Sequence, residues 1–119
     1  MQFKKKPYKR HERLSKQIKI ILSDFILKDF NLEGSGIVTI TKVKISNDLS
    51  NAKIFYSVIN NAISNQELLV SLNKKSRFIK GIIGRKITSK NIPNIIFYFD
   101  ESVELYEKMD RIFLKLNDG

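Results

Sequence analysis

Seven basic residues lie between Lys74 and Lys90 with no acidic residue among them, so this segment could bind a polyanion. Helical spacing would place Ile79, Ile83 and Ile87 on one buried face. Two glycines would then fall on the opposite, basic face, where phosphates could approach the backbone closely. The candidate nucleic-acid contacts in this segment are Lys74, Lys75, Ser76, Arg77, Lys80, Gly81, Gly84, Arg85, Lys86 and Lys90.

A second basic cluster lies near the N-terminus, where residues 1–20 carry eight Lys or Arg and one Glu. The two clusters together carry more than the whole net charge of +10. Charge clustered in this way favours a nucleic-acid partner over a membrane surface, because no large apolar face adjoins either cluster. For any single lysine the alternative is a solvated helix face. The candidate contacts here are Lys9, Arg10, Arg13 and Lys16.

The two glycines also match the spacing I-x-G-x-x-G-x-x-I, from Ile79 to Ile87, which is the signature of K-homology (KH) domains. In those domains a GxxG loop clamps the backbone of a single strand. Here Ile82 and Ile83 stand between the glycines, and such residues prefer a core. We therefore favour a helix with two glycines on its polar face, at a cost of about 1 kcal/mol each. A free-standing KH-type module that clamps single-stranded RNA stays open as the alternative.

Catalytic chemistry finds little support in the sequence. Glu104 and Glu107 could share a helix face and suggest a metal-dependent ribonuclease, yet acidic residues are usual near a helix start. The chain has no Cys, and its one histidine, His11, lies in a basic segment where a surface position is expected. We therefore expect no catalytic site, no metal and no small-molecule ligand.

The length of 119 residues predicts a single domain over residues 1–119, with residues 1–7 as a mobile basic tail. The lack of Cys fits a reducing compartment, and no apolar run is long enough to cross a membrane. The N-terminus lacks the apolar stretch of a secretory signal. These features predict a cytoplasmic protein, and we expect a monomer.

Periodicity predicts the order helix, strand, strand, helix, helix, strand, helix. This is an α+β fold in which helices pack on one face of a three-stranded sheet. A polar run at residues 73–77 predicts a break between the two central helices. The predicted elements are helix 8–28, strands 37–46 and 52–59, a helix after the capping box Ser64–Glu67, a helix ending before Pro93, strand 95–99 and helix 103–116.

These periods also predict which side chains are buried. Strict alternation along residues 37–46 would place Val43 and Ile45 on the face opposite Ile40. Strand 95–99 is apolar on both faces, which predicts a central or covered strand. Phe78 is assigned to the core, so we expect recognition of RNA shape and backbone more than of stacked bases. The last helix is expected to turn inward its residues Val103, Tyr106, Met109, Ile112 or Phe113, and Leu116.

Three segments resemble the ribosome-binding factor A family of bacterial small-subunit assembly factors. The first is the entry helix Arg10–Ser23, which begins Arg10-His-Glu-Arg13-Leu14. The second is the hairpin Val38–Ser57, which is the most specific of the three. The third follows Pro93 and contains Phe97-Tyr-Phe-Asp100-Glu-Ser102. The resemblance covers residues 8–116, which is nearly the whole chain.

The resemblance implies a KH-like fold of type II with a kink between the central helices. It implies a factor with no enzymatic activity and no cofactor that binds the free or immature 30S small ribosomal subunit and its 16S rRNA. It also implies a role in late maturation, in processing the 5′ end of pre-16S rRNA, and in cold adaptation. The family places Ala-x-Gly at the kink, whereas this chain has Lys75-Ser76-Arg77 and departs from the pattern at both key residues.

Overall fold

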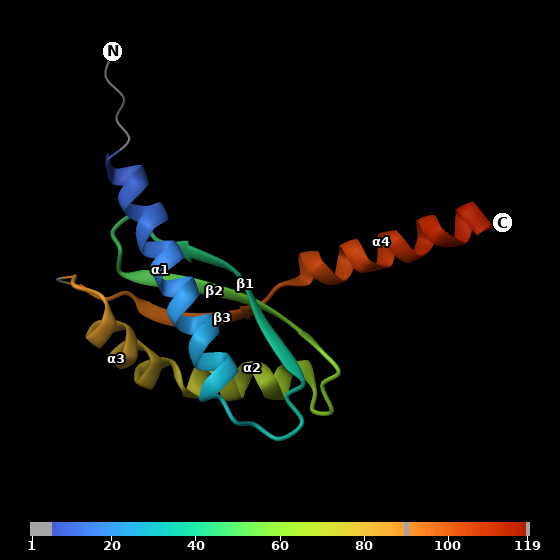
Figure 1. Ribbon diagram of the computed structural model, residues 1–119, viewed down its shortest axis with the longest axis horizontal. Coiled ribbons are helices and arrows are strands. Elements are labelled where there is room, and N and C mark those ends of the chain that lie inside the picture. Colours follow the sequence, from blue (N-terminus) through green and yellow to red (C-terminus); the bar gives the residue numbers. More distant parts are fainter. Residues whose placement is uncertain (1–5, 90, 119) are drawn as a thin grey trace, which may run out of the picture.

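Four helices and a three-stranded sheet form the protein (Figure 1). In chain order they are α1 (Lys6–Lys28), β1 (Ile37–Ile45), β2 (Asn51–Ile59), α2 (Asn65–Lys74), α3 (Ser76–Lys86), β3 (Asn94–Phe99) and α4 (Glu101–Asp118). The computed structural model describes the backbone of residues 6–89 and 91–118, and the side chains of residues 10–89, 91–102, 108–112 and 114–116. The predicted α+β class and element order are confirmed. No helix in the described ranges is long and apolar enough to cross a membrane.

The sheet joins an antiparallel hairpin to a parallel edge strand, in the order β1-β2-β3. Strands β1 and β2 pair antiparallel, as predicted. Strand β3 runs parallel to β2, with Phe55 beside Tyr98, and leaves its other edge free. The prediction of a central or covered strand is therefore wrong. Ile96 and Tyr98 are 37% and 38% exposed, because only one face of this edge strand packs on the core.

A β-bulge at Thr41 shifts the pairing of β1 between Ile40 and Lys42. Strict alternation predicted Val43 and Ile45 on the face opposite Ile40, and this prediction is wrong. The extra residue changes the phase of the strand, so both side chains pack against the core on the same side as Ile40. The same shift turns both lysines of β1 to the opposite, open face of the sheet.

Helices α1, α2 and α3 supply one layer of the core and the inner face of the sheet supplies the other. Figure 1 shows α2 and α3 on the same side of the strands, with α1 running obliquely beside them. The apolar stripe predicted for α1 is confirmed: Leu14, Ile18 and Leu22 are buried, as are Ile79 and Ile83 of α3. Fully burying one such side chain stabilises the fold by about 1.5–3 kcal/mol. These contacts fix the positions of both basic helices.

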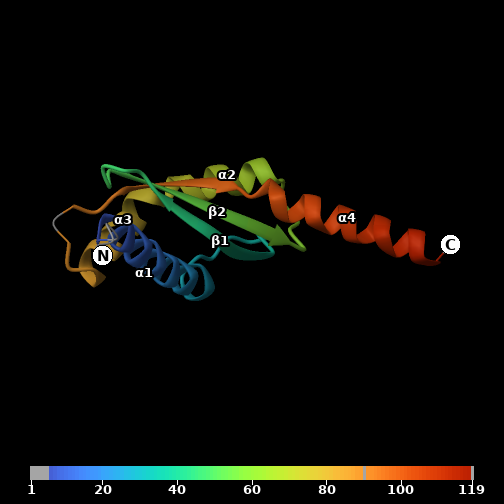
Figure 2. The same cartoon turned by 90° about the horizontal axis from the view of Figure 1, so that it is seen from above.

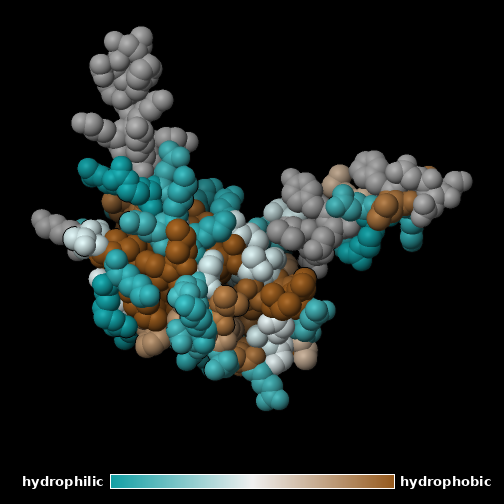
Figure 3. Space-filling view, in the orientation of Figure 1, coloured by the Kyte–Doolittle hydropathy of each residue, from teal (hydrophilic) through white to brown (hydrophobic). Residues whose placement is uncertain are grey.

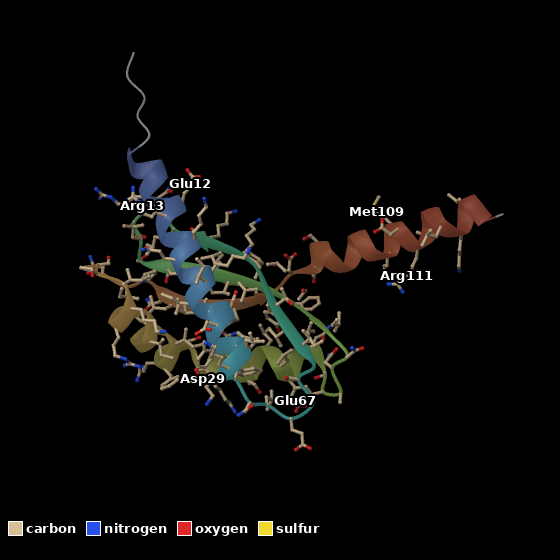
Figure 4. All side chains as sticks on the ribbon, in the orientation of Figure 1. Glu12, Arg13, Asp29, Glu67, Met109 and Arg111 are labelled. Carbon is tan, nitrogen blue, oxygen red and sulfur yellow. The ribbon has the colours of Figure 1, made fainter. Side chains whose placement is uncertain are left out.

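Helices α2 and α3 meet at a single residue, Lys75, whose φ is −90° and ψ is −2°. The Lys75 amide donates to the Leu72 carbonyl oxygen at 3.0 Å, and its carbonyl oxygen accepts from the Ile79 amide at 2.9 Å. One residue therefore ends α2 and begins α3, which confirms the predicted break. Ser64 accepts from the Glu67 amide at 3.0 Å at the start of α2, while the Glu67 side chain points away from the body (Figure 4).

Asn73 ties this break to the free edge of β3. Its Oδ1 accepts a hydrogen bond from the Phe97 amide at 2.8 Å, and its Nδ2 donates to the Phe97 carbonyl oxygen at 3.3 Å. An edge strand otherwise leaves such backbone groups unpaired. The side-chain amide thus takes the place of a neighbouring strand, and it holds the junction of the two central helices against the sheet.

Asp100 attaches α4 to the sheet. Its Oδ1 accepts from the Ser102 amide at 3.0 Å, in the position of a helix N-cap, and its Oδ2 accepts from the Thr41 hydroxyl. The hydroxyls of Ser102 and Thr41 lower the pKa of Asp100 below its ordinary value, because they stabilise the ionised carboxylate. The start of α4 is therefore bonded to the bulge of β1.

Helix α4 then extends away from the core (Figure 1). The prediction that it turns its apolar stripe inward is wrong for Met109, Ile112 and Leu116, which are 44%, 58% and 70% exposed. The reason is that α1, α2 and α3 already occupy the covered face of the sheet. Figure 3 shows hydrophobic side chains on the surface of α4. Val103, Tyr106 and Phe113 lie outside the described side chains.

Candidate nucleic-acid interface

A groove lies between α1 and the segment that follows α3. The groove has a volume of about 460 Å³. Arg10 and Arg13 line it from α1, Thr88 and Asn91 line it from the other segment, and Leu49 reaches it from the β1–β2 turn. Figure 2 shows α1 lying along β1. Segments far apart in the sequence therefore line one groove, whose positive charge comes from the two arginines of α1, and we call it the helix-side groove.

The amphipathic character of both helices places their basic residues on the outside. Helix α1 buries Leu14 and Ile18 and exposes the residues between them, while α3 buries Ile79 and Ile83. Figure 4 shows Arg13 and Glu12 leaving α1 on different sides. Lys9 and Lys90 lie outside the described side chains. The predicted contacts that are exposed are Arg10, Arg13, Lys16, Lys74, Lys75, Arg77, Gly81, Gly84, Arg85 and Lys86.

Two of the predicted contacts also have structural partners. Lys80 is half-buried, and its ammonium donates to Asn94 Oδ1 at 2.8 Å. Ser76 is half-buried as well, and its hydroxyl lies 3.5 Å from Asn73 Oδ1. Among the side chains that the structure describes, no carboxylate forms an ion pair with any exposed basic residue of this surface. Their charges are therefore available to an anionic ligand.

Gly81 and Gly84 lie inside α3, so the structure contradicts a GxxG loop clamp. The preferred prediction, a helix with two glycines on its polar face, is confirmed. A Cβ added at Gly81 would meet only Arg85 Nη1 at 3.8 Å, and one at Gly84 would meet Ile92 Cγ1 at 3.6 Å. Both are ordinary contacts, so neither position requires glycine for its backbone or its packing. The two glycines leave the exposed face of α3 without side chains at these positions, and they do not form a loop.

Phe78 is not a core residue, and the prediction that it is buried is wrong. Its side chain is 58% exposed, and its ring lies beside Phe25 with the centroids 6.0 Å apart. The neighbouring Ile79 takes the inward position of this turn of α3. Phe78 therefore covers the edge of the core between α1 and α3, and it leaves an aromatic surface beside the basic side chains.

The break between α2 and α3 needs no small residue in this chain. Lys75 adopts a negative φ that any L-residue can reach, and Arg77 lies in the first turn of α3 with its side chain exposed. The bonds from Asn73 to β3 hold the break in place. The departure from Ala-x-Gly thus leaves the break intact and adds two exposed cations, Lys75 and Arg77, to its surface.

Sequence reasoning missed the uncharged lining of the groove. Gln17, Leu49 and Asn91 carry no charge and belong to no motif, and they meet only because the β1–β2 turn folds toward α1. Leu49 has a φ of +63°, which no periodicity signals. As for catalysis, the side chains that the structure describes include no group of three or more possible metal ligands. Glu104 and Glu107 lie outside the described side chains.

Comparisons with known proteins agree on the family. The family model described as ribosome-binding factor A matches residues 10–113. Ribosome-binding factor A of Desulforamulus reducens is 36% identical over 108 residues, which cover 91% of this chain and 90% of the relative. The protein of the same name from Natranaerobius thermophilus is 33% identical over 110 residues, which cover 92% of this chain and 84% of the relative.

Solved structures show the same fold. The crystal structure of ribosome-binding factor A from Thermus thermophilus matches with a TM-score of 0.61 and 20% identity, covering 74% of this chain and 93% of that one. The solution structure of a Thermotoga maritima protein described as a putative ribosome-binding factor A matches with a TM-score of 0.55 and 23% identity. It covers 76% of this chain and 83% of that one. These structures have a KH-like fold, as predicted for this chain. With the family model and the two relatives, they show that the chain belongs to the ribosome-binding factor A family.

Proposed function

We propose that this protein binds the free small ribosomal subunit through its 16S rRNA and assists the late maturation of that subunit. The observation that carries the proposal is the helix-side groove, which Arg10 and Arg13 of α1 charge positively and whose other side is lined by the segment that follows the exposed basic end of α3. Membership of the family supports it, because the relatives are named as ribosome-binding factors. A Thermus thermophilus relative has also been fitted as a homology model into a map of a 30S complex.

The chemistry of the groove suits the backbone of rRNA. Arginine can bind phosphate oxygens through two parallel hydrogen bonds, and Arg10 and Arg13 supply two such side chains at one end of the groove. The exposed lysines and arginines of α2 and α3 extend the positive surface. Contacts of this kind position a protein on RNA without reading its sequence. The choice of site would then depend on the shape of the subunit.

Co-sedimentation provides the direct test. The wild-type protein should pellet with free small subunits and not with whole ribosomes. The double variant Arg10→Gln with Arg13→Gln should lose most of this binding. A matched control, Lys108→Gln with Lys115→Gln, removes the same charge from exposed positions on α4 and should bind as the wild type does. Equal binding by both double variants would contradict the assignment of the groove.

The salt dependence of RNA binding gives an estimate of the number of phosphate contacts. About six contacts to single-stranded RNA should give a log–log slope near −4 to −5, and loss of two should reduce it by about 1.4. A wild-type slope near −1 would contradict a multisite interface.

The proposed role in processing is tested separately, by measuring the 5′ end of pre-16S rRNA in cells that carry only the double arginine variant. Unprocessed 5′ ends should accumulate, and a normal 5′ end would contradict that role.

A further inference from the structure

The face of the sheet opposite the core carries a compact arrangement of aromatic and basic side chains. The rings of Phe55 on β2 and Tyr98 on β3 stack with their centroids 5.7 Å apart and their planes at 29°. These two residues are partners in the β2–β3 register. The core lies behind both strands, and the described part of the chain places no helix over the pair. We call Phe55, Tyr98 and the lysines around them the open-face platform.

Three lysines surround the aromatic pair. Lys42 pairs with Phe55 across β1 and β2, and its Nζ lies 5.5 Å from the Phe55 ring centroid. The Nζ of Lys53 lies 5.6 Å from the Tyr98 ring centroid. Lys44 pairs with Lys53 and is exposed, as the other two lysines are. None of the three strands contains an acidic residue, and the carboxylate that interacts with this group is Asp100, which directly follows β3 and attracts Lys42.

We propose that the open-face platform is a second nucleic-acid site, which binds unpaired nucleotides by stacking bases on Phe55 and Tyr98 while the lysines hold the adjacent phosphates. A β-sheet surface that presents aromatic rings between basic side chains suits a single strand, because every base has a π-face and every nucleotide carries a negative charge. A duplex suits it poorly, since its bases are already stacked on one another. The proposal extends the proposed function to a surface on the other side of the sheet.

The energies favour a base over the lysines that now lie near the rings. An exposed cation–π contact is worth about 0.5–1 kcal/mol. Stacking of one base on an aromatic ring is worth about 1–3 kcal/mol. A displaced lysine loses little, because its flexible stem allows the ammonium to swing to a phosphate. A pocket of about 190 Å³ lined by Lys44, Ser46, Asn51 and Lys53 adjoins the platform and provides room for that phosphate.

With Thr41 present in β1, the β-bulge is what keeps both lysines of that strand on this face. Without the phase change at Thr41, strict alternation from Ile40 would turn Lys42 and Lys44 toward the core. With it, both lysines stand on the same face as Phe55. Sequence reasoning found only Phe78 as an aromatic residue within a basic segment and assigned it to the core, and it missed the platform because the platform's residues come from three strands and meet only in the sheet.

Binding of a short labelled oligouridine tests the proposal by fluorescence anisotropy at fixed salt, with an RNA duplex of equal length as the comparison. The variants Phe55→Leu and Tyr98→Leu remove one ring each but keep an apolar side chain. Each should weaken single-strand binding by about 5- to 150-fold, the equivalent of one lost stack, and leave duplex binding unchanged. Tyr98→Phe retains the ring and should bind as the wild type does. Unchanged oligouridine binding by a folded Leu variant would overturn the proposal.

Two further measurements cover variants that fail to fold and other occupants of the face. Cross-linking of the wild-type protein to 5-iodouridine RNA should label the peptides with Phe55 or Tyr98, and labelling confined to α1 and α3 would overturn the proposal. Self-association of the free protein that Tyr98→Leu abolishes would assign the face to a second copy instead. The helix-side variant Arg10→Gln with Arg13→Gln should bind oligouridine more weakly through lost phosphate contacts but should still cross-link at Phe55 or Tyr98, so failure of subunit binding and failure of the platform are distinguishable.

Discussion

Replacing Asn73 by Ala removes the only side chain among the described residues that bonds to the backbone of β3 at its free edge. Two groups lose their partner, the amide and the carbonyl oxygen of Phe97, and the Phe97 side chain is only 1% exposed. Each hydrogen bond contributes about 1 kcal/mol, and a buried donor left unpaired costs about 1–3 kcal/mol. The free energy of unfolding should therefore fall by about 2–3 kcal/mol. In a domain of this size that lowers the Tm by about 10 °C.

Asn73→Asp and Gln66→Ala are the matched controls. The aspartate keeps an acceptor for the Phe97 amide, but it loses the donor to the Phe97 and Leu69 carbonyl oxygens and places a carboxylate oxygen near both, so most of the loss should remain. Gln66 is exposed on the same helix, and its replacement should change the free energy of unfolding by less than about 0.5 kcal/mol. Urea denaturation followed by circular dichroism measures all three variants.

Hydrogen exchange locates the effect at one amide. Strand geometry sends the amides of alternate residues to opposite edges, so the Phe97 amide points to Asn73 while those of Ile96 and Tyr98 point to β2. In Asn73→Ala the Phe97 amide should lose its protection and the other two should keep theirs. The reasoning about this edge is refuted if the free energy of unfolding of Asn73→Ala lies within about 0.5 kcal/mol of the wild-type value. That difference is about one third of the upper value for a single hydrogen bond.

Four further outcomes are expected. Gly36→Ala should destabilise by about 3 kcal/mol or more in urea denaturation, because φ is +73° and the added Cβ would lie 2.3 Å from the Ile59 carbonyl oxygen; a loss below about 1 kcal/mol would contradict this. Gly81→Ala should stabilise by about 1 kcal/mol in the same assay, since it adds a helix former at an open position. Tyr56→Phe should raise the Tm, because the Tyr56 hydroxyl is the one buried side-chain polar atom without a partner among the described residues, and an unpaired hydroxyl costs about 1–3 kcal/mol. The Asp48 pKa is lowered to about 2 by hydrogen bonds from Ser50 and Ser46. That stabilisation is present above the unfolded-state pKa of about 4 and is lost as pH falls through 2, so Asp48→Asn should show less acid sensitivity of unfolding between pH 4 and pH 2.

The fold was largely predictable from the sequence because its helices are strongly amphipathic. The stripe of α1 from Leu14 to Ile26 and the isoleucine ladder of α3 each specify one buried face, and the structure buries both. The break at 73–77 was predictable for the same reason, since the apolar stripe stops there. Periodicity is a local signal, and these features depend on residues within a few turns of one another.

The wrong predictions concern features that depend on contacts between residues far apart in the sequence. The bulge could have been found from a three-residue step between the inward residues Ile40 and Val43, but the alternation of Thr and Lys around them hid it. The apolar stripe of α4 was correctly recognised as amphipathic, yet periodicity does not say whether the sheet has room for another helix. The edge position of β3 follows from parallel pairing with β2, which no local pattern of Ile95–Phe99 reveals.

The candidate site divides in the same way. Charge clustering predicted Arg10, Arg13 and the exposed residues of α3, because net charge can be counted along the chain. The helix-side groove and the open-face platform could not be predicted, since each of them brings together elements that are separated in sequence. Asn73 read as part of a polar break, and only its position beside Phe97 shows that it bonds to the sheet.

Thr41 is the extra residue of β1, and this has a consequence for how the C-terminal helix is attached. Its hydroxyl has one proton to donate and lies nearer to Asp100 Oδ2 than to the Phe55 carbonyl oxygen, which is 3.2 Å away. Deleting Thr41 would leave every other side chain of β1 on its present face, because the remaining residues alternate regularly. It would remove the bond to Asp100 at the start of α4. One residue of β1 therefore holds the start of α4 in place without being needed for the two faces of the sheet.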